Sequence, residues 1–279
     1  MATLYVVATP IGNLEDVTLR ALRVLREVGL IAAEDTRVAR KLLARHGIEA
    51  RLISFNDHNK SIRLPEIIGR LAETDIALIS DAGTPAISDP GVELVAAARA
   101  AGHAVVPVPG PSAVVTALSV AGLRARTYRF LGFLPREAGP LRRLFASLAS
   151  GPDTLVAFEA PGRVKRTLQL LAETLPERRL AVCRELTKLH EEVLVGTAAD
   201  VLARLHEARG EFVLVIEGAR AAKPQPADES AWREELAAMR DVGLTRSQAA
   251  ALLERRYGVS RRRMYELWLD AGGRPGPRA

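Results

Sequence analysis

The chain has 279 residues, of which 48% are hydrophobic and 26% charged, so its length and composition suit a folded protein of two domains. No window approaches the ~20 uninterrupted apolar residues of a transmembrane helix, the first residues resemble no secretory signal, and a lone cysteine, Cys183, excludes an intramolecular disulfide. We therefore expect a cytoplasmic protein, and its formal net charge of +6 favours acidic partners such as nucleic acid.

From residue 4 to about residue 122, short apolar runs alternate with helical patterns. The apolar runs predict strands at residues 4–8, 30–33, 52–55, 76–80 and 104–108. Helical spacing predicts one helix through Val17, Leu22, Leu25 and Val28 and others near 38–46, 64–73, 92–101 and 111–121. This alternation is typical of a largely parallel, doubly wound sheet.

A short hinge at residues 122–125 precedes a second set of apolar runs. These predict strands at residues 130–133, 154–159, 180–184, 192–195 and 212–217. The third and fourth are too close in sequence for a helical crossover, so this sheet should be mixed or antiparallel. The sequence therefore predicts two α/β domains, at residues 1–122 and 126–220.

The last part of the chain is polar, then helical and basic. A Pro-containing linker at residues 221–230 precedes a tail at residues 231–279. In the tail, Thr245 and Gln248 form a capping box for a helix that ends at Gly258, and Ser260 can cap a second helix. Arginines are dense around these helices, which favours a small helix-turn-helix-like element that contacts RNA, although the same arginines could form a solvated face.

Four loops rich in Gly, Pro and small polar residues follow four of the predicted strands. They are residues 9–13, 81–91, 109–113 and 159–163. Ordinary turns use these residues too, but four such loops at strand ends indicate a shared crevice. Asp81 and Asp89 in the second loop argue against a phosphate ligand, and no P-loop occurs in the chain, so a neutral or cationic ligand is favoured.

Together these motifs resemble the tetrapyrrole-methylase superfamily, within it the branch of small-subunit ribosomal RNA (cytidine-2′-O)-methyltransferases. The resemblance covers nearly the whole chain, in order. It is carried by residues 9–13 (TPIGN), 33–37 (AEDTR), 80–85 (SDAGTP), 88–91 (SDPG), 109–113 (PGPSA), 132–135 (GFLP), 184–188 (RELTK) and the tail around 249–265. One departure is at residues 160–163, which read APGR where the branch commonly has Ser-Pro-His-Arg.

The resemblance implies that S-adenosylmethionine binds in a cleft between two α/β domains and that a cytidine ribose in the decoding region of 16S RNA is methylated. By the same analogy, the cofactor residues are Pro10, Asp81, Ala82, Gly83, Thr84, Ser112, Ala113, Phe158, Leu186 and Phe212. Two of these residues also have structural interpretations, because Asp81 could form an Asx turn and Ser112 could cap the following helix.

The ribose 2′-hydroxyl is a poor nucleophile until its proton is removed or shared. The candidates for this chemistry are Glu34, Asp35 and Glu185, with Lys188 as a stabiliser of charge. Each could instead form a structural ion pair, for example Glu34 or Asp35 with Arg37. No His and carboxylate cluster has the spacing of metal ligands, so we predict no metal site.

Candidate RNA contacts are basic or polar residues in loops and in the tail. They are Arg37, His58, Asn59, Arg136, Arg163, Arg255, Arg261, Arg262 and Arg263. A loop histidine can also be merely solvated. The resemblance further implies a homodimer that acts on small-subunit RNA, with the assembled subunit as the expected substrate. The competing hypotheses are a small-molecule or protein methyltransferase of the same superfamily, and a noncatalytic RNA-binding assembly factor.

Overall fold

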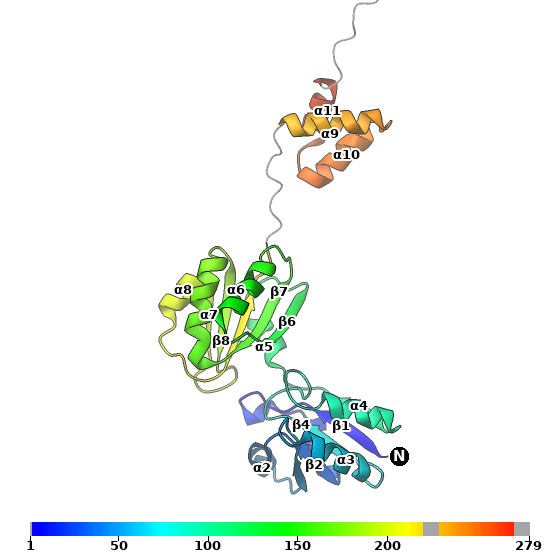
Figure 1. Ribbon diagram of the computed structural model, residues 1–279, viewed down its shortest axis with the longest axis vertical. Coiled ribbons are helices and arrows are strands. Elements are labelled where there is room, and N and C mark those ends of the chain that lie inside the picture. The colour runs from blue at the N-terminus through cyan, green and yellow to red at the C-terminus, as the bar shows by residue number, and fades with distance from the viewer. Residues whose placement is uncertain (1, 220–228, 271–279) are drawn as a thin grey trace, which may run out of the picture. The chain divides into compact units, whose positions relative to one another are not determined.

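The computed structural model describes residues 2–219 and 229–270 (Figure 1). They form two compact units that divide after Gly218. The larger unit contains two sheets, and the smaller unit is helical. Among the described residues, no helix is long and apolar enough to cross a membrane.

The first sheet is five-stranded and entirely parallel. Its strands are β1 (Thr3–Val7), β2 (Leu30–Ala33), β3 (Leu52–Ser54), β4 (Ile76–Ile79) and β5 (Ala104–Val108), in the spatial order β3-β2-β4-β1-β5. The residues of β2 and β4 are buried throughout, as their uninterrupted apolar sequences require of central strands. The predicted parallel sheet is confirmed.

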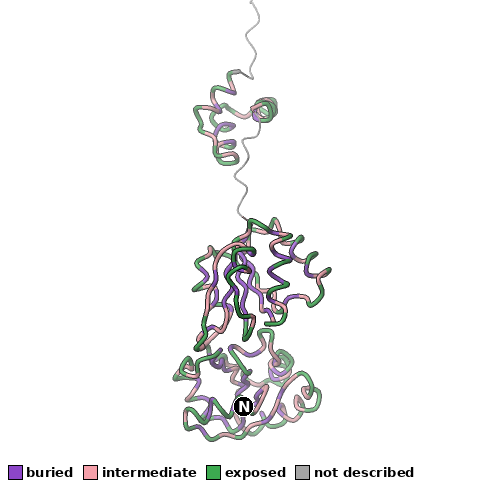
Figure 2. The backbone as a smooth tube through the Cα atoms, turned by 90° about the vertical axis from the view of Figure 1, so that its left-hand side faces the viewer, coloured by how far each residue is buried: buried purple, intermediate pink, exposed green. Residues whose placement is uncertain are grey.

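Helices cover both faces of this sheet, so that each face has its own apolar core. A short 3₁₀ turn, η1 (Leu14–Asp16), leads to α1 (Leu19–Glu27), which packs with α2 (Thr36–Arg45) on one face. On the other face lie α3 (Lys60–Arg70) and α4 (Val92–Ala100). The buried segments in Figure 2 follow the strands and the inner helix surfaces.

The start of α3 differs from the expected one. The pattern predicted a helix at 64–73, which would put Pro65 in the first turn, where its missing N–H costs nothing. Instead α3 begins at Lys60 and carries Pro65 inside the helix. The turn that precedes it is held by Asn59, whose Oδ1 accepts the Asn56 N–H at 2.9 Å, so the helix starts from this local turn ahead of the proline.

The second sheet is also five-stranded but mixed, as predicted. Its strands are β6 (Tyr128–Phe133), β7 (Thr154–Glu159), β8 (Arg179–Arg184), β9 (Glu192–Thr197) and β10 (Phe212–Ile216), in the order β6-β7-β10-β8-β9. Only β6 and β7 pair in parallel; the other neighbours are antiparallel. The β8–β9 pair is the one whose short connection excluded a helical crossover.

Two sets of helices sandwich this sheet. On one face pack α6 (Ala138–Ser147), α7 (Pro161–Thr174) and α8 (Ala198–Arg204), seen together in Figure 1. On the other face packs α5 (Ala113–Val120), through Val114, Ala117 and the following Ala121. This helix was predicted as the last element of the first domain, but its apolar side belongs to the core of the second sheet.

The smaller unit contains α9 (Glu229–Asp241), α10 (Arg246–Tyr257) and α11 (Arg261–Asp270), packed around Trp232, Leu236, Leu253 and Met264. The predicted linker at 221–230 falls mostly outside the described residues. The predicted end of the linker is corrected by the structure, because the last two residues of that range begin α9. Glu229 is favourable at a helix N-terminus and forms an ion pair with Arg263 of α11, a partner that local composition does not reveal.

Candidate active site

A cavity of about 360 Å³ lies where the loops of the first sheet meet the second sheet. All four Gly- and Pro-rich loops contribute to it, in agreement with the expected shared crevice. Its apolar wall includes Ile11, Phe158, Leu186 and Val213. Its lining also includes the carboxylates of Glu34, Asp81, Asp89, Glu159 and Glu211, and no Lys or Arg of the described residues lines it. The complete lining is Ile11, Glu34, Asp81, Ala82, Asp89, Ala113, Phe133, Phe158, Glu159, Ala160, Pro161, Cys183, Leu186, Gly210, Glu211, Phe212 and Val213.

Backbone pairing between loops forms the floor of this region. The N–H of Thr9 donates to the Gly83 carbonyl at 2.8 Å, and the N–H of Gly83 donates back to Thr9 at 3.0 Å. Gly83 has a φ of +83°, a conformation that favours glycine. The Thr84 hydroxyl donates to the carbonyl of Pro111 at 3.2 Å. These bonds tie the 81–91 loop to both neighbouring loops.

The 9–13 loop packs directly against the segment that follows β8. The Asn13 N–H donates to the Thr187 hydroxyl at 3.0 Å. A Cβ on Gly12 would lie 2.8 Å from the Leu186 carbonyl oxygen and 2.6 Å from Cγ of Lys188. Only a residue without a side chain permits this approach, which brings Ile11 and Leu186 to the same cavity.

Glu34, Asp81 and Asp89 line the cavity on the side of the first sheet, which we call its mouth. The Asp81 N–H donates to Oε2 of Glu34 at 3.2 Å, and Oδ1 of Asp81 accepts the Asp35 N–H at 3.0 Å, so the ends of β2 and β4 brace each other. Burial raises the pKa of Glu34, although the hydrogen bond from the Asp81 N–H acts in the opposite direction. Burial likewise raises the pKa values of Asp81 and Asp89. The mouth is therefore a region where positive charge is favoured.

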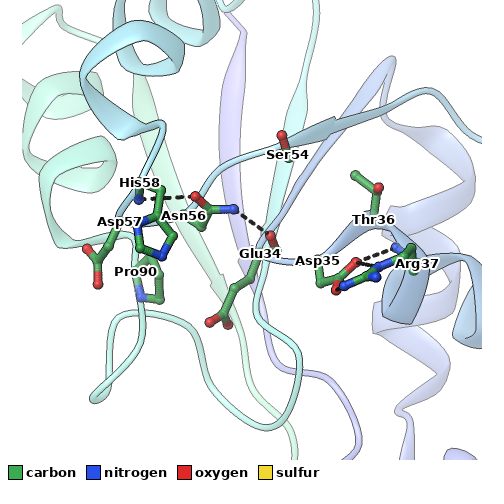
Figure 3. Close-up of a pocket in the computed structure, with 9 residues that line it drawn as sticks. All are labelled: Glu34, Asp35, Thr36, Arg37, Ser54, Asn56, Asp57, His58 and Pro90. Carbon is green, nitrogen blue, oxygen red and sulfur yellow. Dashed lines mark hydrogen bonds and ion pairs between the residues drawn. The ribbon is translucent and has the colours of Figure 1, made fainter.

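A second, polar pocket of about 410 Å³ lies beside Glu34 (Figure 3). Its lining is Glu34, Asp35, Thr36, Arg37, Ser54, Asn56, Asp57, His58 and Pro90. Glu34 thus lines both the cavity and the polar pocket. In Figure 3 its side chain lies between the loop of Asn56 to His58 and the turn of Asp35 to Arg37.

Asp35 and Arg37 pair with each other, as the structural alternative anticipated. Asp35 is the N-cap of α2 and accepts the Arg37 N–H at 2.7 Å, and its carboxylate also pairs with the guanidinium at 2.6 Å. These bonds lower the pKa of Asp35 to about 2. Such a weak base at a helix N-terminus is suited to capping rather than to proton removal.

Glu185 and Lys188 also pair with each other, Nζ to Oε1, at 2.8 Å. The same oxygen of Glu185 accepts the Glu211 N–H at 3.0 Å. Burial works against the charged form, but the bonds from Lys188 and Glu211 hold the pKa of Glu185 below its ordinary value. Neither Glu185 nor Lys188 lines the cavity or the polar pocket, so their contacts describe a brace between two loops.

The predicted cofactor residues divide into two groups. Asp81, Ala82, Ala113, Phe158, Leu186 and Phe212 line the cavity. Pro10, Gly83, Thr84 and Ser112 do not; Gly83 and Thr84 instead form the loop floor described above. Ser112 is the N-cap of α5 but its side chain makes no capping hydrogen bond, and Asp81 bonds across to Asp35 rather than forming an Asx turn.

Two of the predicted RNA-contact residues also have partners within the protein. The Asn59 side chain donates to the Ser54 hydroxyl at 2.9 Å and accepts from the Asn56 N–H, so it holds its own loop. Arg163 pairs at 2.6 Å with Glu159, whose side chain is 1% exposed. A buried carboxylate needs such a partner, so Arg163 has a structural role beside its predicted contact with phosphate. His58 and Arg136 are exposed.

Within the smaller unit, the four predicted arginines differ in their partners. Arg261 pairs with Glu254 at 2.6 Å, and Arg263 pairs with Glu229 and Glu266. Arg262 has a side chain that is 91% exposed, and Arg255 is also exposed. The latter two are the arginines of this set that present most charge to solvent.

Sequence reasoning missed several cavity residues. Gly210 and Glu211 enter because they precede β10, whose antiparallel pairing with β7 and β8 puts its start at the same sheet edge as their ends. Gly210 has a φ of +85°, and a Cβ there would lie 2.4 Å from Cδ of Glu185. The Gly before an apolar run was the available signal for this position.

The two sheets, the loops between them and the cavity define an α/β methylase fold. Residues 3–202 match the family described as Tetrapyrrole (Corrin/Porphyrin) Methylases. The chain belongs to this family. Among solved structures, uroporphyrin-III-C-methyltransferase from Thermus thermophilus is similar with a TM-score of 0.57 and 24% identity, covering 78% of this chain and 94% of that one. A cobalt precorrin-4 methyltransferase is similar with a TM-score of 0.59 and 17% identity, covering 76% of this chain and 94% of that one.

Curated relatives are more similar in sequence and span nearly the whole chain. A protein of Synechocystis named ribosomal RNA small subunit methyltransferase I is 46% identical, covering 97% of this chain and 98% of the relative. Proteins of the same name are 44% identical in Neisseria meningitidis serogroup B, with 96% and 93% covered, and 41% identical in Bacillus subtilis, with 96% and 94% covered.

Proposed function

We propose that the protein is an S-adenosylmethionine-dependent methyltransferase that modifies the ribose 2′-oxygen of a cytidine in small-subunit ribosomal RNA. The observation that carries this proposal is the similarity to the ribosomal RNA methyltransferases, which extends through the tail as well as the methylase domain. We further propose that it works in the cytoplasm, as a homodimer, on the assembled subunit.

The cavity has the chemistry that this cofactor requires. Its apolar wall suits an adenosine and a thioether chain, while its mouth carries Glu34, Asp81 and Asp89 and no lining Lys or Arg. Carboxylates favour a cation and disfavour a phosphate, as the sequence of the 81–91 loop suggested. Asp81, Ala82, Ala113, Phe158, Leu186 and Phe212 would hold the cofactor, with Ile11 and Val213 added by the structure.

S-adenosylmethionine supplies an electrophilic methyl on a sulfonium sulfur, so the transfer forms one O–C bond, breaks one C–S bond and releases the hydroxyl proton. Glu34 is the carboxylate placed to take that proton, because it lines both the cavity and the polar pocket. Burial raises its pKa toward the working pH, which improves a general base. Asp35, Glu185 and Lys188 are assigned to structure instead.

The smaller unit supplies RNA affinity in this proposal. Arg255 and Arg262 are exposed and would contact backbone phosphates, as would Arg136 beside the 132–135 loop. Binding of small-subunit RNA is measured against salt concentration for the full chain and for a chain ending at residue 229. The truncated chain should bind more weakly and with a shallower dependence on log salt, and an unchanged slope would contradict the role of the tail.

The experiment that tests the function transfers labelled methyl from S-adenosylmethionine in three parallel reactions. The acceptors are assembled small subunits, naked small-subunit RNA and a porphyrin precursor. Label on RNA that protects one ribose from alkaline cleavage supports the proposal, since methylation removes the 2′-hydroxyl that attacks the phosphate. Label on the porphyrin alone would reject RNA as the substrate, and failure to label any acceptor would reject the activity.

A further inference from the structure

We propose that the polar pocket beside Glu34 is the subsite for one unstacked pyrimidine nucleoside, and that Asp57 in it selects cytosine over uracil. This inference rests on the proposed function, because it names the part of the RNA that the second pocket takes. The polar pocket and the cavity share one wall.

The shared wall consists of the end of β2 and one loop. Glu34 lines both pockets, while within the 81–91 loop Asp89 lines the cavity and Pro90 lines the polar pocket. In this loop Ala86 and Ser88 have φ values of +67° and +62°, a strained conformation of the kind that gathers at ligand sites. A ribose held in the polar pocket therefore meets the cavity at Glu34.

The pocket has the size and the access for a nucleoside. Its volume of about 410 Å³ lies within the range of small-molecule sites. A base inside a duplex could not enter, because enzymes that act on one nucleotide need it unstacked or single-stranded. The exposed ring of His58 offers a flat surface for stacking, which is a common mode of single-strand recognition.

The side chains that line the polar pocket differ in how much of their hydrogen-bonding capacity is free to contact a base. The Asn56 side chain donates to the Glu34 carbonyl at 3.3 Å and accepts the His58 N–H at 3.1 Å, so it is used by the loop itself. Asp35 is used by Arg37. Asp57 has a side chain that is 71% exposed and one ion pair, to Lys60 at 3.0 Å, which leaves acceptor capacity on its carboxylate.

A carboxylate can accept the exocyclic N4–H₂ of cytosine but meets only another acceptor in O4 of uracil. With Glu34 committed to the ribose, Asp57 is the remaining lining acid that can read the base. Arg37, with a side chain 84% exposed, can reach a flanking phosphate while it pairs with Asp35. The arrangement therefore assigns ribose, base and phosphate to three different lining residues.

The test measures binding rather than methyl transfer, so that it is independent of turnover. Calorimetric titration of the full chain with the trinucleotides CpCpC and UpUpU gives the ratio of the two dissociation constants. Wild type should prefer CpCpC by about 10-fold, the value of a good carboxylate contact to a base edge. Asp57→Asn should bring the ratio within about 2-fold, because an amide can also donate to uracil O4.

The control is Glu49→Gln, which removes one exposed negative charge from the same sheet domain outside the pocket. It should change both affinities equally and leave the ratio intact. His58→Ala should weaken both trinucleotides together. A C-to-U ratio of one in wild type, or one that Asp57→Asn leaves unchanged, would overturn the subsite. If cytosine selectivity is present but no RNA is methylated, the subsite stands and the proposed activity fails.

Discussion

Substitution of Gly12 by alanine tests whether the contact between the 9–13 loop and the 185–188 segment shapes the cavity. The added Cβ would lie 2.6 Å from Cγ of Lys188 and 2.8 Å from both the Leu186 carbonyl oxygen and the Thr187 hydroxyl. The lysine chain can move aside, but the Leu186 carbonyl oxygen cannot move without the backbone of the turn that follows β8. One of the two segments must therefore shift.

Overpacking of this kind costs about 1–3 kcal/mol. Because Ile11 and Leu186 both line the cavity, the shift should also weaken S-adenosylmethionine binding, by about 10-fold for each ~1.4 kcal/mol that reaches the site. Calorimetric titration with the cofactor gives the affinity, and urea unfolding gives the free energy of unfolding. Both should fall in Gly12→Ala.

The matched control is Gly69→Ala. Gly69 lies inside α3, and a Cβ there meets nothing within 4 Å. Replacing a helical glycine by alanine should raise the free energy of unfolding by about 0.5–1 kcal/mol and leave cofactor affinity unchanged. If Gly12→Ala behaved like this control, the tight packing at Gly12 would not determine the cavity and the argument would be refuted.

Three further predictions concern single side chains. Burial raises the pKa of Glu34 above its ordinary value of 4.5, so the folded state favours the protonated side chain, and this contribution to stability is lost as the pH rises through the folded-state pKa. In urea titrations, Glu34→Gln should therefore raise the free energy of unfolding at neutral pH but not near pH 4. The same substitution should abolish methyl transfer. Arg163→Ala should lower the free energy of unfolding by about 3 kcal/mol, because it leaves Glu159 buried without its cation. The control is Arg166→Ala, which removes an exposed arginine of the same helix and should leave the free energy of unfolding unchanged. Thr245→Ala should cost the smaller unit about 1 kcal/mol through loss of the N-cap, seen as a lower melting temperature of its helices by circular dichroism; an unchanged melt would contradict that capping role.

The strands and the two sheets were predictable because their signal is local. Uninterrupted apolar runs such as Ile76–Ile79 and Phe212–Ile216 indicate buried strands, and spacing alone excluded a crossover between β8 and β9. The start of α3 and the start of α9 could not be read this way. For α3, a local turn held by Asn59 starts the helix ahead of Pro65. For α9, Glu229 pairs with Arg263, which is distant in sequence, so the polar composition does not reveal the helix start.

The sequence was sufficient to predict which loops form the site, but not which partners the charged residues in those loops contact. Strand ends locate the 9–13, 81–91 and 109–113 loops at one edge, and the cavity is indeed there. Whether a charged residue in such a loop is free depends on groups distant in sequence. Glu185 is held by the N–H of Glu211, 26 residues away, and Asp81 by that of Asp35, 46 residues away.

Glu34 and Asp35 are adjacent acids that the sequence alone does not distinguish, but their contacts in the fold differ. Asp35 follows the strand by one more residue, reaches the N-cap of α2 and is neutralised by Arg37, so its pKa falls to about 2. Glu34 lines both pockets and accepts one backbone N–H, and no ion pair links it to a cation of the described residues, so burial raises its pKa. One residue of register at the end of β2 thus decides which carboxylate can act as a base and which can only hold the helix.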